Sequence, residues 1–570
     1  MTTGLNGRRS LICLSKFPMP SVQFFAISKR RCLWEHKSHA NAEAELKITP
    51  KLFPDLIPAP AELLAKFGGR RPAKNAMITR VGPSPTGMMH IGTLYVGLIN
   101  AMLANQSDGT MILRLEDTDK SREVEGASEF IIQSLDRYGI KIDEGPTLSG
   151  QERGSHGPYV QSCRRKIYQS FAKHLLLQGK AYPCFSTRDE LESARKEQAK
   201  LGVRTGYYGS WATWRDANDQ AISNAIRARL PWVLRFRSDG DHSKKTSFED
   251  CIFGQREMAE NDQDIVILKN DGMPTYHFAH VVDDYLMGTT HVVRGEEWLA
   301  SVPTHLQLFE AFDWQPPKYA HVAPINKMDG TSRRKLSKRK DPESSVLFFE
   351  QEGYPEEAVL EYLLSLADSG WGGPIFDFDK LDHVSKEYLA SLSAREVFER
   401  GLQWANRFDK EFGKTLAVDP HYTQNALSIE RGTANARKDI RKWSDLRSEI
   451  GYFFESCFRP DAKAASNHLS FLSRDELSGF VTQFLASYDP SNERDDWFAR
   501  LKFVALENGF AASPKDFRHN PNNFKGSISH AAMVLRVLLT GSPISPDLFS
   551  IMQVMGPERV CRRLSMGATK

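Results

Sequence analysis

The stretch of sequence that decides the fold is residues 77–93, which read MITRVGPSPTGMMHIGT. Its apolar start, 77–81, predicts a short strand, and the glycines and prolines at 82–87 predict a turn. Apolar residues then recur at helical spacing from 90 to 105, and a second apolar run follows at 110–115. Strand, turn, helix and strand in this order predict a parallel β-α-β unit with a right-handed crossover, as in nucleotide-binding α/β domains.

The segment from about 157 to 260 has a different character. Helical patterns at 164–178 and 187–201 are followed by a strand-like run at 232–236. This mixture predicts an α+β insertion rather than a continuation of the first sheet. Beyond it we expect, in chain order, strand-like runs at 265–268, 281–282 and 291–294, a helix around 306–312 and a basic loop at 333–340.

The last third of the chain carries apolar residues at helical spacing, as at Val359, Leu363 and Leu366. We therefore expect a predominantly α-helical C-terminal region. A length of 570 residues predicts three to five domains. Seven scattered cysteines form no Cys-x-x-Cys pair, which argues against a disulfide framework and favours a reducing compartment.

The composition is typical of a globular protein, with 41% hydrophobic and 26% charged residues. No apolar run is long enough to span a bilayer, so we expect no contact with a membrane. The net charge of +4 permits a polyanionic partner but equally fits a mildly basic enzyme.

The first 34 residues are basic and contain no acidic residue. Its six basic residues are Arg8, Arg9, Lys16, Lys29, Arg30 and Arg31. The serines of this segment lie among apolar residues. An Arg- and Ser-rich, acid-poor leader is typical of an organelle transit peptide. The alternative is a basic leader without a targeting role. We expect import into the mitochondrial matrix.

The turn before the helix has the residues of a phosphate-binding site. Gly87 and Gly92 permit close approach of the backbone, and the helix N-terminus offers unpaired N–H groups to an anion. His90 adds a donor at the same place. A histidine beside a glycine is by itself more often structural, so the interpretation depends on the whole string at 80–93.

A basic stretch at 332–340 reads SRRKLSKRK. Alone it is equally typical of a solvated charged loop or of a nucleic-acid-binding patch. A cationic loop is also what an adenylating enzyme needs, because negative charge develops on the ATP α-phosphate when a carboxylate attacks it.

These two segments resemble the two signature motifs of class I aminoacyl-tRNA synthetases, HIGH and KMSKS. The surrounding strings PSPTGxxHIG, LRLEDTD and KLSKRK are similar to those of the glutamyl-tRNA synthetases. Further similar segments lie at 157–162, 271–284, 293–298 and 535–564, so that the resemblance runs from about 76 to the C-terminus.

The resemblance implies a Rossmann-type α/β catalytic domain with an α+β acceptor-binding insertion, followed by a predominantly α-helical anticodon-binding region. The boundaries that we then expect are 1–45 for the targeting segment, 46–75 for a linker, 76–156 and 278–330 for the two halves of the catalytic domain, 157–277 for the insertion, 331–410 for the signature loop and stem-contact domain, and 411–570 for the anticodon-binding domain.

The same resemblance implies a reaction in which glutamate and ATP form glutamyl-adenylate, and the tRNA 3′ end then takes the glutamyl group. Glutamate has two carboxylates, which two guanidinium forks can bind. The residues expected to bind glutamate are Arg80, Ser84, Glu116, Tyr276, His280 and Arg294. Arg294 is expected at the side-chain carboxylate, and Ser84 and Glu116 at the α-ammonium.

ATP, accompanied by Mg²⁺, is expected along both signature segments and Glu297. The ATP-binding residues implied are His90, Gly92, Glu297, Lys335, Leu336, Ser337, Lys338 and Arg339, and those with a catalytic role are His90, Gly92, Lys335 and Lys338. Lys338 is expected at the α-phosphate. The Mg²⁺ would bridge phosphate oxygens rather than occupy a cage made by the protein.

Two positions depart from the family's pattern. His280 stands where the family commonly has asparagine, and histidine brings a charge that can follow pH. Some relatives bind zinc after the start of the insertion, but here the segment reads Cys184-Phe185-Ser186 and a later cysteine position is Trp211. One thiol cannot make a tetrahedral site, so we expect no structural zinc.

The partners implied are tRNA-Glu and L-glutamate, bound by a monomer, and whether tRNA-Gln is also charged stays open. Basic residues such as Arg431 and Lys438 are expected either to contact tRNA phosphates or to form a solvated helix face. A glutaminyl-tRNA synthetase would end in β-barrels, a truncated tRNA-modifying relative would stop before the helical region, and a non-catalytic tRNA-binding protein would lack the signature residues.

Overall fold

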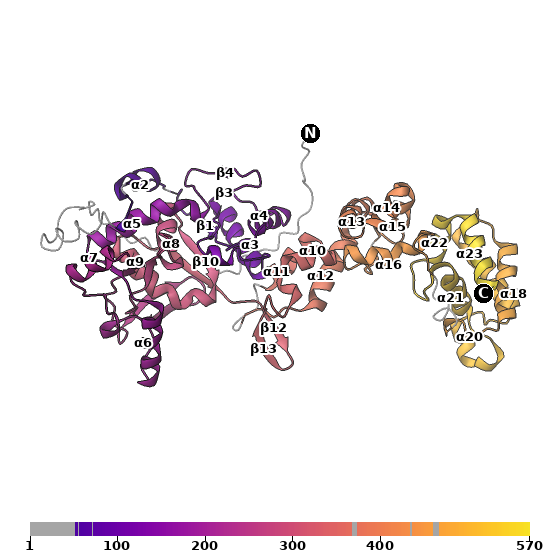
Figure 1. The fold of residues 1–570 in the computed structure, drawn as a ribbon. Helices are drawn as coiled ribbons and strands as arrows, with labels where there is room; N and C mark the ends of the chain where they lie inside the picture. The colour runs from indigo at the N-terminus through magenta and orange to yellow at the C-terminus, as the bar shows by residue number, and fades with distance from the viewer. Residues whose placement is uncertain are drawn as a thin grey trace.

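The computed structural model describes residues 52–569, apart from 55, 71, 367–372, 434–435 and 460–466. The expected targeting segment, 1–45, lies outside the described residues. The α/β part of the molecule and the C-terminal helices lie at opposite ends, with the helices from α12 (Phe378–Ser391) to α16 (Leu446–Ile450) between them (Figure 1). No helix among the described residues combines the length and the apolar character needed to cross a membrane.

The first α/β unit forms as the sequence predicts. Strands β1 (Ile78–Val81) and β2 (Thr110–Leu113) are parallel, with Ile78 opposite Thr110, and helix α3 (Ile91–Gln106) connects them. Ile91 and Leu94 of α3 are fully buried. After α4 (Ala127–Arg137), a small hairpin of β3 (Gly145–Pro146) and β4 (Glu152–Arg153) follows. The β-α-β prediction is therefore confirmed.

A second parallel pair lies beside the first. Strands β10 (His291–Gly295) and β11 (Lys318–Val322) are parallel, and α9 (Val302–Ala311) connects them. The backbone N–H of Thr290 donates to the carbonyl of Ile78 at 3.0 Å, which places the start of β10 beside β1. The carboxyl ends of these strands therefore open to the same side of the molecule, where ligands of open α/β sheets bind.

The insertion is α+β, as predicted. It contains α5 (Arg165–Leu177), α6 (Arg188–Lys200) and α7 (Asp219–Arg227), and an antiparallel sheet of β5 (Ala181–Cys184), β6 (Val233–Phe236) and β9 (Val266–Leu268). The start of α6 is fixed by a capping box in which Thr187 and Glu190 satisfy each other's backbone N–H groups.

The structure corrects three expectations for this region. The hairpin of β7 (Lys245–Asp250) and β8 (Gly254–Ala259) lies within 157–277, yet it joins β11, with Asp250 opposite Tyr319. Within the segment expected to be a linker, α2 (Pro60–Phe67) packs on α5 and buries Leu63 and Phe67. The strand-like run at 281–282 belongs to helix α8 (Tyr276–Leu286).

The sequence did not predict α8 to be a helix because two of its buried residues, Asp283 and Asp284, are acidic. Asp284 accepts hydrogen bonds from Arg80 and Arg114 of the catalytic strands. Asp283 accepts them from the insertion, namely from Arg164 Nε at 2.7 Å, Tyr168 Oη at 2.8 Å and Gln161 Nε2 at 2.9 Å. Buried carboxylates of this kind interrupt the apolar pattern from which a helix is predicted.

The rest of the chain begins with a hairpin of β12 (Asn326–Asp329) and β13 (Ser332–Lys335), so that the expected basic loop starts as a strand. The helices that follow are α10 (Val346–Glu352), α11 (Glu356–Leu366), α12 (Phe378–Ser391), α13 (Ala394–Phe408), α14 (Lys410–Val418), α15 (Pro420–Ser428), α16 (Leu446–Ile450), α18 (Arg474–Ser487), α19 (Arg494–Glu507), α20 (Pro514–His519), α21 (Ile528–Thr540), α22 (Leu548–Met555) and α23 (Pro557–Thr569). One apolar cluster runs through this region from Leu389 to Leu564, whereas α10 and α11 pack into the core of the first α/β unit. The prediction of a helical C-terminal region is confirmed.

Candidate active site

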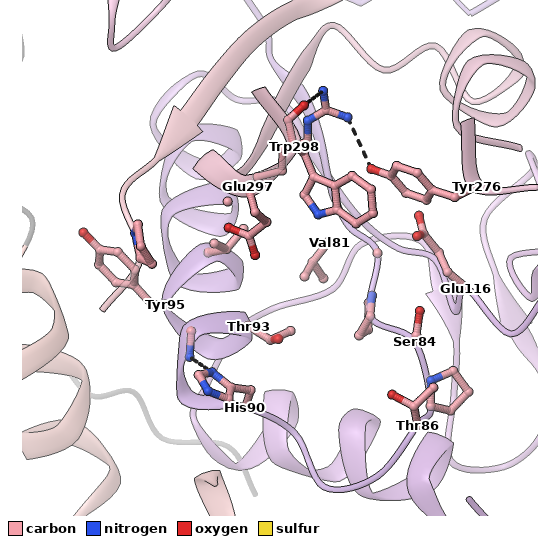
Figure 2. A pocket seen from close by; sticks show the side chains of 18 of the residues that line it. Val81, Ser84, Thr86, His90, Thr93, Tyr95, Glu116, Tyr276, Glu297 and Trp298 are labelled. Carbon is pink, nitrogen blue, oxygen red and sulfur yellow. Dashed lines mark hydrogen bonds between the residues drawn. The ribbon is translucent and has the colours of Figure 1, made fainter. Parts of the chain in front are cut away.

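A cavity of about 570 Å³ opens at the carboxyl ends of β1, β2 and β10. The predicted residues that line it are Arg80, Ser84, His90, Gly92, Glu116, Tyr276, Arg294, Glu297, Lys335 and Lys338. In Figure 2, Ser84, Glu116 and Tyr276 lie on one side of the cavity, and His90 and Glu297 lie toward the other. The structure therefore brings both signature segments and the expected glutamate-binding residues to one place.

His90 is the N-cap of α3. Its Nδ1 accepts a hydrogen bond from the backbone N–H of Gly92 at 2.9 Å. Burial, reinforced by Lys338 and Lys335, lowers the pKa of His90 to about 4. The ring is therefore neutral near pH 7, and because Nδ1 is an acceptor, the proton lies on Nε2. His90 is thus a neutral donor at the mouth of a helix N-terminus, which suits a phosphate oxygen.

Behind one end of the cavity, which Arg80 lines, two guanidinium groups share one buried carboxylate. Asp284 accepts from Arg80 Nε at 3.2 Å and from Arg114 Nη1 at 2.6 Å. Arg114 also donates to Glu116 Oε1 at 3.0 Å. Burial raises the pKa of Glu116, although Arg114 and Arg80 oppose this. A Cβ on Gly82 would lie 2.4 Å from Glu116 Oε1, so only glycine permits this approach.

Arg294 is a buried cation that has no carboxylate partner among the residues that the structure describes. Its guanidinium donates to His321 Nε2 at 3.0 Å, Tyr276 Oη at 3.2 Å and the carbonyl of Trp298 at 3.2 Å. The side chain is 5% exposed, and no Asp or Glu of the described residues lies within ion-pair distance of it. A buried charge is costly unless it is paired. This part of the cavity therefore favours an anionic group.

His280 does not line the cavity. Its Nε2 lies 3.1 Å from Tyr319 Oη, and its Nδ1 lies 2.8 Å from Asp284 Oδ2 without the alignment of a hydrogen bond. Its ring stacks behind that of Tyr276 at 6.0 Å. Burial lowers the pKa of His280 to about 3. The expectation of a charge that follows pH in the physiological range is therefore wrong, because the buried imidazole stays neutral.

This neutral state predicts a dependence of stability on pH. The pKa of His280 is about 3 in the folded protein and 6.5 when unperturbed, so the unfolded state binds the extra proton and stability falls as pH falls below 6.5. Between pH 7 and pH 5 the wild type should lose about 2 kcal/mol more unfolding free energy than a His280→Asn variant. Denaturant unfolding of both proteins at the two pH values measures this difference. An equal loss in both would contradict the prediction.

The second signature segment is anchored at both ends. Leu336 is buried in the core beneath the cavity. Asp341 accepts from Arg334 Nη1 at 2.6 Å and from the backbone N–H of Ser337 at 2.9 Å. Leu336, Ser337 and Arg339 consequently do not line the cavity, in contrast to the ATP-binding role expected of them. They instead help to fix the conformation of the segment that carries Lys335 and Lys338.

Those two lysines cross the cavity to the opposite wall. Lys335 Nζ lies 3.0 Å from Glu297 Oε1, and Lys338 Nζ donates to the carbonyl of Met88 at 2.9 Å. Burial lowers the pKa of Lys338. Lys338 therefore reaches the turn before α3, where the first signature segment lies, and Lys335 reaches the residues that follow β10.

Several residues of the site were missed by the sequence interpretation, namely Arg114, Asp284, Trp298, His305 and His321. A signal for some of them was present. Arg114 directly follows the apolar strand β2, His321 lies inside the apolar strand β11, and Asp284 lies inside the apolar helix α8. Such residues are buried only when they are paired, so they indicate a functional or structural network.

The cysteine segment of the insertion forms part of a hydrogen-bonded cluster. Cys184 is buried at the end of β5, and its thiol lies 3.4 Å from the hydroxyl of Tyr207. Ser186 Oγ lies 3.3 Å from the same hydroxyl. Across the part of the chain that the structure describes, no three His, Cys, Asp or Glu side chains are grouped as metal ligands.

Comparison with known proteins agrees with this geometry. Residues 76–373 match the family model for the catalytic domain of class I tRNA synthetases (E and Q), and residues 522–568 match a model of an anticodon binding domain. The fold and the site thus define a class I tRNA synthetase, in which residues of both signature segments line one cavity.

The similar proteins narrow this class further. The chain is 41% identical to the glutamate–tRNA ligase of Acetivibrio thermocellus, covering 87% of this chain and 95% of the relative. It is 39% identical to that of Clostridium perfringens, covering 90% and 98%. A crystal structure of a glutamate tRNA ligase from Elizabethkingia meningosepticum superposes with a TM-score of 0.69 at 26% identity, covering 86% of this chain and 99% of that one. The chain belongs to the glutamate–tRNA ligases.

Proposed function

We propose that this enzyme activates L-glutamate with ATP and transfers the glutamyl group to the 3′ end of tRNA, and that the cavity residues divide this work as their positions suggest. The observation that carries the substrate assignment is Arg294, a buried guanidinium whose neighbours are neutral acceptors. A substrate carboxylate would complete its charge pairing.

Glutamate would lie between the two arginine positions. Its side-chain carboxylate would bind Arg294 and Tyr276, which share a hydrogen bond. Arg80 would serve the α-carboxyl end, and Glu116 and Ser84 would hold the α-ammonium. Burial raises the pKa of Glu116. The ammonium group of bound glutamate would act in the opposite direction, because a nearby positive charge stabilises the ionised carboxylate.

ATP would lie along the first turn of α3, between His90 and the two lysines of the second signature segment. Lys338 would stabilise the charge that develops on the α-phosphate. We propose that Mg²⁺ enters with the nucleotide as MgATP, because this ion prefers phosphate oxygens as ligands. No protein nucleophile is needed, because both steps depend on orientation and charge stabilisation.

The deciding experiment is an aminoacylation assay with glutamate, ATP and organellar tRNA-Glu and tRNA-Gln, measured separately. Glutamate transfer to tRNA-Glu is the expected result, and no transfer to either tRNA would refute the proposal. Charging of both tRNAs would show a non-discriminating enzyme, and charging of tRNA-Glu alone a discriminating one. Glutamine in place of glutamate serves as the control, because it lacks the second carboxylate.

We also propose that the enzyme acts as a monomer, because a single chain brings both signature segments and the expected glutamate-binding residues to one cavity. The helices from α13 onward would receive the anticodon loop, whose unstacked bases protein side chains can stack on and hydrogen-bond. Arg431 and Lys438 carry less support as tRNA contacts. Arg431 donates to the carbonyl of Leu389, and Lys438 pairs with Glu387 at 2.6 Å.

Mitochondrial import is our proposal for the location of the enzyme. It is supported by the composition of the first 34 residues, which are basic and acid-free. Residues 1–45 fused to a fluorescent protein should direct it to mitochondria. The matched control replaces the six basic residues of its first 34 positions with glutamine and should remain in the cytosol. Cytosolic fluorescence of the unaltered fusion would refute the proposal.

A further inference from the structure

Arg294 is the first member of a buried chain of three side chains. Its Nε donates to His321 Nε2 at 3.0 Å. On the other side of the imidazole, His321 Nδ1 lies 2.6 Å from Asp250 Oδ2. His321 is fully buried and Asp250 is 1% exposed. The chain therefore runs from the cavity wall to a carboxylate that neither lines the cavity nor belongs to a signature segment.

The two contacts fix the tautomer of His321. A guanidinium can only donate, so Nε2 must be an acceptor and carry no proton. Burial lowers the pKa of His321, which keeps the ring neutral near pH 7. The single ring proton then lies on Nδ1, where it is donated to Asp250. Without the carboxylate, the ring is free to adopt the other tautomer, whose Nε2–H would face the N–H of Arg294.

The imidazole also separates the carboxylate from the guanidinium. A carboxylate in direct contact with Arg294 would neutralise it and compete with an anionic ligand. With the neutral ring of His321 between them, Asp250 orients Arg294 without pairing with its positive charge. That charge therefore stays available for an anionic ligand. The other contacts of the guanidinium follow the same rule, since Tyr276 Oη and the carbonyl of Trp298 are neutral and burial lowers the pKa of His305, whose Nδ1 lies at 3.4 Å.

Asp250 is itself held rigidly. Its Oδ1 accepts from the backbone N–H groups of Ile252 and Phe253, each at 2.9 Å. It ends strand β7, opposite Gly254 of β8 and Tyr319 of β11. The pKa of Asp250 is lowered, although burial opposes this, by the hydrogen bonds from His321 and from the turn. The β7–β8 hairpin therefore brings a fixed negative charge to the back of the amino-acid site.

We propose that Asp250 is a positioning residue for amino-acid recognition, acting through the tautomer of His321 on the orientation of Arg294. The proposal rests on the proposed role of Arg294 at the substrate carboxylate. It assigns a function in substrate recognition to the β7–β8 hairpin, which the chain places inside the insertion.

The test is an Asp250→Asn variant of the full chain. Asparagine keeps an oxygen for the turn but presents an NH₂ group that favours the wrong tautomer, as in the Asp→Asn variant of a catalytic triad. We expect the KM for glutamate to rise about 10- to 100-fold. This is the usual effect of losing a residue that orients a metal-binding histidine, and His321 is oriented in the same way. The KM values for ATP and tRNA should change less than about twofold, because Arg294 contributes uniform binding of one substrate.

The matched control is Glu249→Gln, which removes a negative charge from the neighbouring exposed position of β7. It should leave all three KM values unchanged. A second measurement distinguishes positioning from structural damage. If Asp250 acts through His321, the double variant of Asp250→Asn and His321→Gln should bind glutamate no worse than His321→Gln alone, whereas independent effects would add.

The outcomes separate the two proposals. The positioning role would be overturned if the KM of Asp250→Asn for glutamate stayed within about twofold of the wild type. It would also be overturned if the KM values for glutamate and ATP rose equally while thermal stability fell. Additive effects in the double variant would overturn it as well. Arg294→Ala measured in parallel tests the underlying assignment: unimpaired charging by that variant would refute the role of Arg294 itself.

Discussion

Replacing Arg294 with alanine is expected to lower kcat/KM for glutamate by about 10³-fold or more, which corresponds to about 4 kcal/mol. The guanidinium is 5% exposed and has no carboxylate partner among the described residues. A substrate carboxylate brought into the same pocket of the variant would be buried and unpaired, at a large cost in free energy. Steady-state aminoacylation with varied glutamate measures the effect, and binding of tRNA should persist.

Two further variants define the cause of this loss. Arg294→Lys keeps the charge but loses the planar fork that contacts His321, Tyr276 and the carbonyl of Trp298, so it should recover only part of the activity. Arg188→Ala removes an exposed arginine at the start of α6 and should behave as the wild type. Retained charging by Arg294→Ala would show that another group binds the side-chain carboxylate.

Replacing Lys338 with alanine is expected to reduce kcat for adenylate formation by about 10²- to 10³-fold. Its ammonium crosses the cavity to the carbonyl of Met88 at 2.9 Å, beside the turn that leads to His90. A positive charge at this position stabilises the α-phosphate more in the transition state than in bound ATP, so the KM for ATP should change little. Pyrophosphate exchange in the presence of tRNA measures the step.

Lys340→Ala is the matched control for Lys338→Ala. Lys340 is exposed, belongs to the same basic stretch and does not line the cavity. The control removes the same charge from the neighbourhood and should retain most of the activity. If both variants lost activity equally, the general positive charge of the segment would explain the loss, and the specific role of Lys338 would be refuted.

The sequence predicted those parts of the fold in which apolar spacing follows the secondary structure. The β-α-β unit at 78–113 and the helices after 345 are of this kind. The errors occurred where buried charges or tertiary contacts override that spacing. The run at 281–282 was assigned to a strand because Asp283 and Asp284 hide the helical period of α8, and the pairing of the β7–β8 hairpin with β11 depends on contacts distant in the sequence.

The same distinction holds for the site. Motif residues such as Arg80, His90 and Lys338 were predicted and lie at one cavity. His280 was predicted as a contact of glutamate but lies behind Tyr276, because a motif gives a position in the chain and not the direction of a side chain. Asp250 and His321 were not predicted, since they belong to no motif and act only through a chain of buried hydrogen bonds.

Two consecutive residues of α8 also have a consequence for how the protein folds. Asp284 is paired with Arg80 and Arg114 of the catalytic domain, whereas Asp283 accepts hydrogen bonds from Arg164, Tyr168 and Gln161 of the adjoining insertion and lies 3.7 Å from Arg114 Nε. Local opening of either side would leave a fully buried carboxylate without its partners, which is strongly unfavourable. The insertion and the catalytic sheet are therefore expected to open together, and amide hydrogens on both should exchange with one common protection free energy.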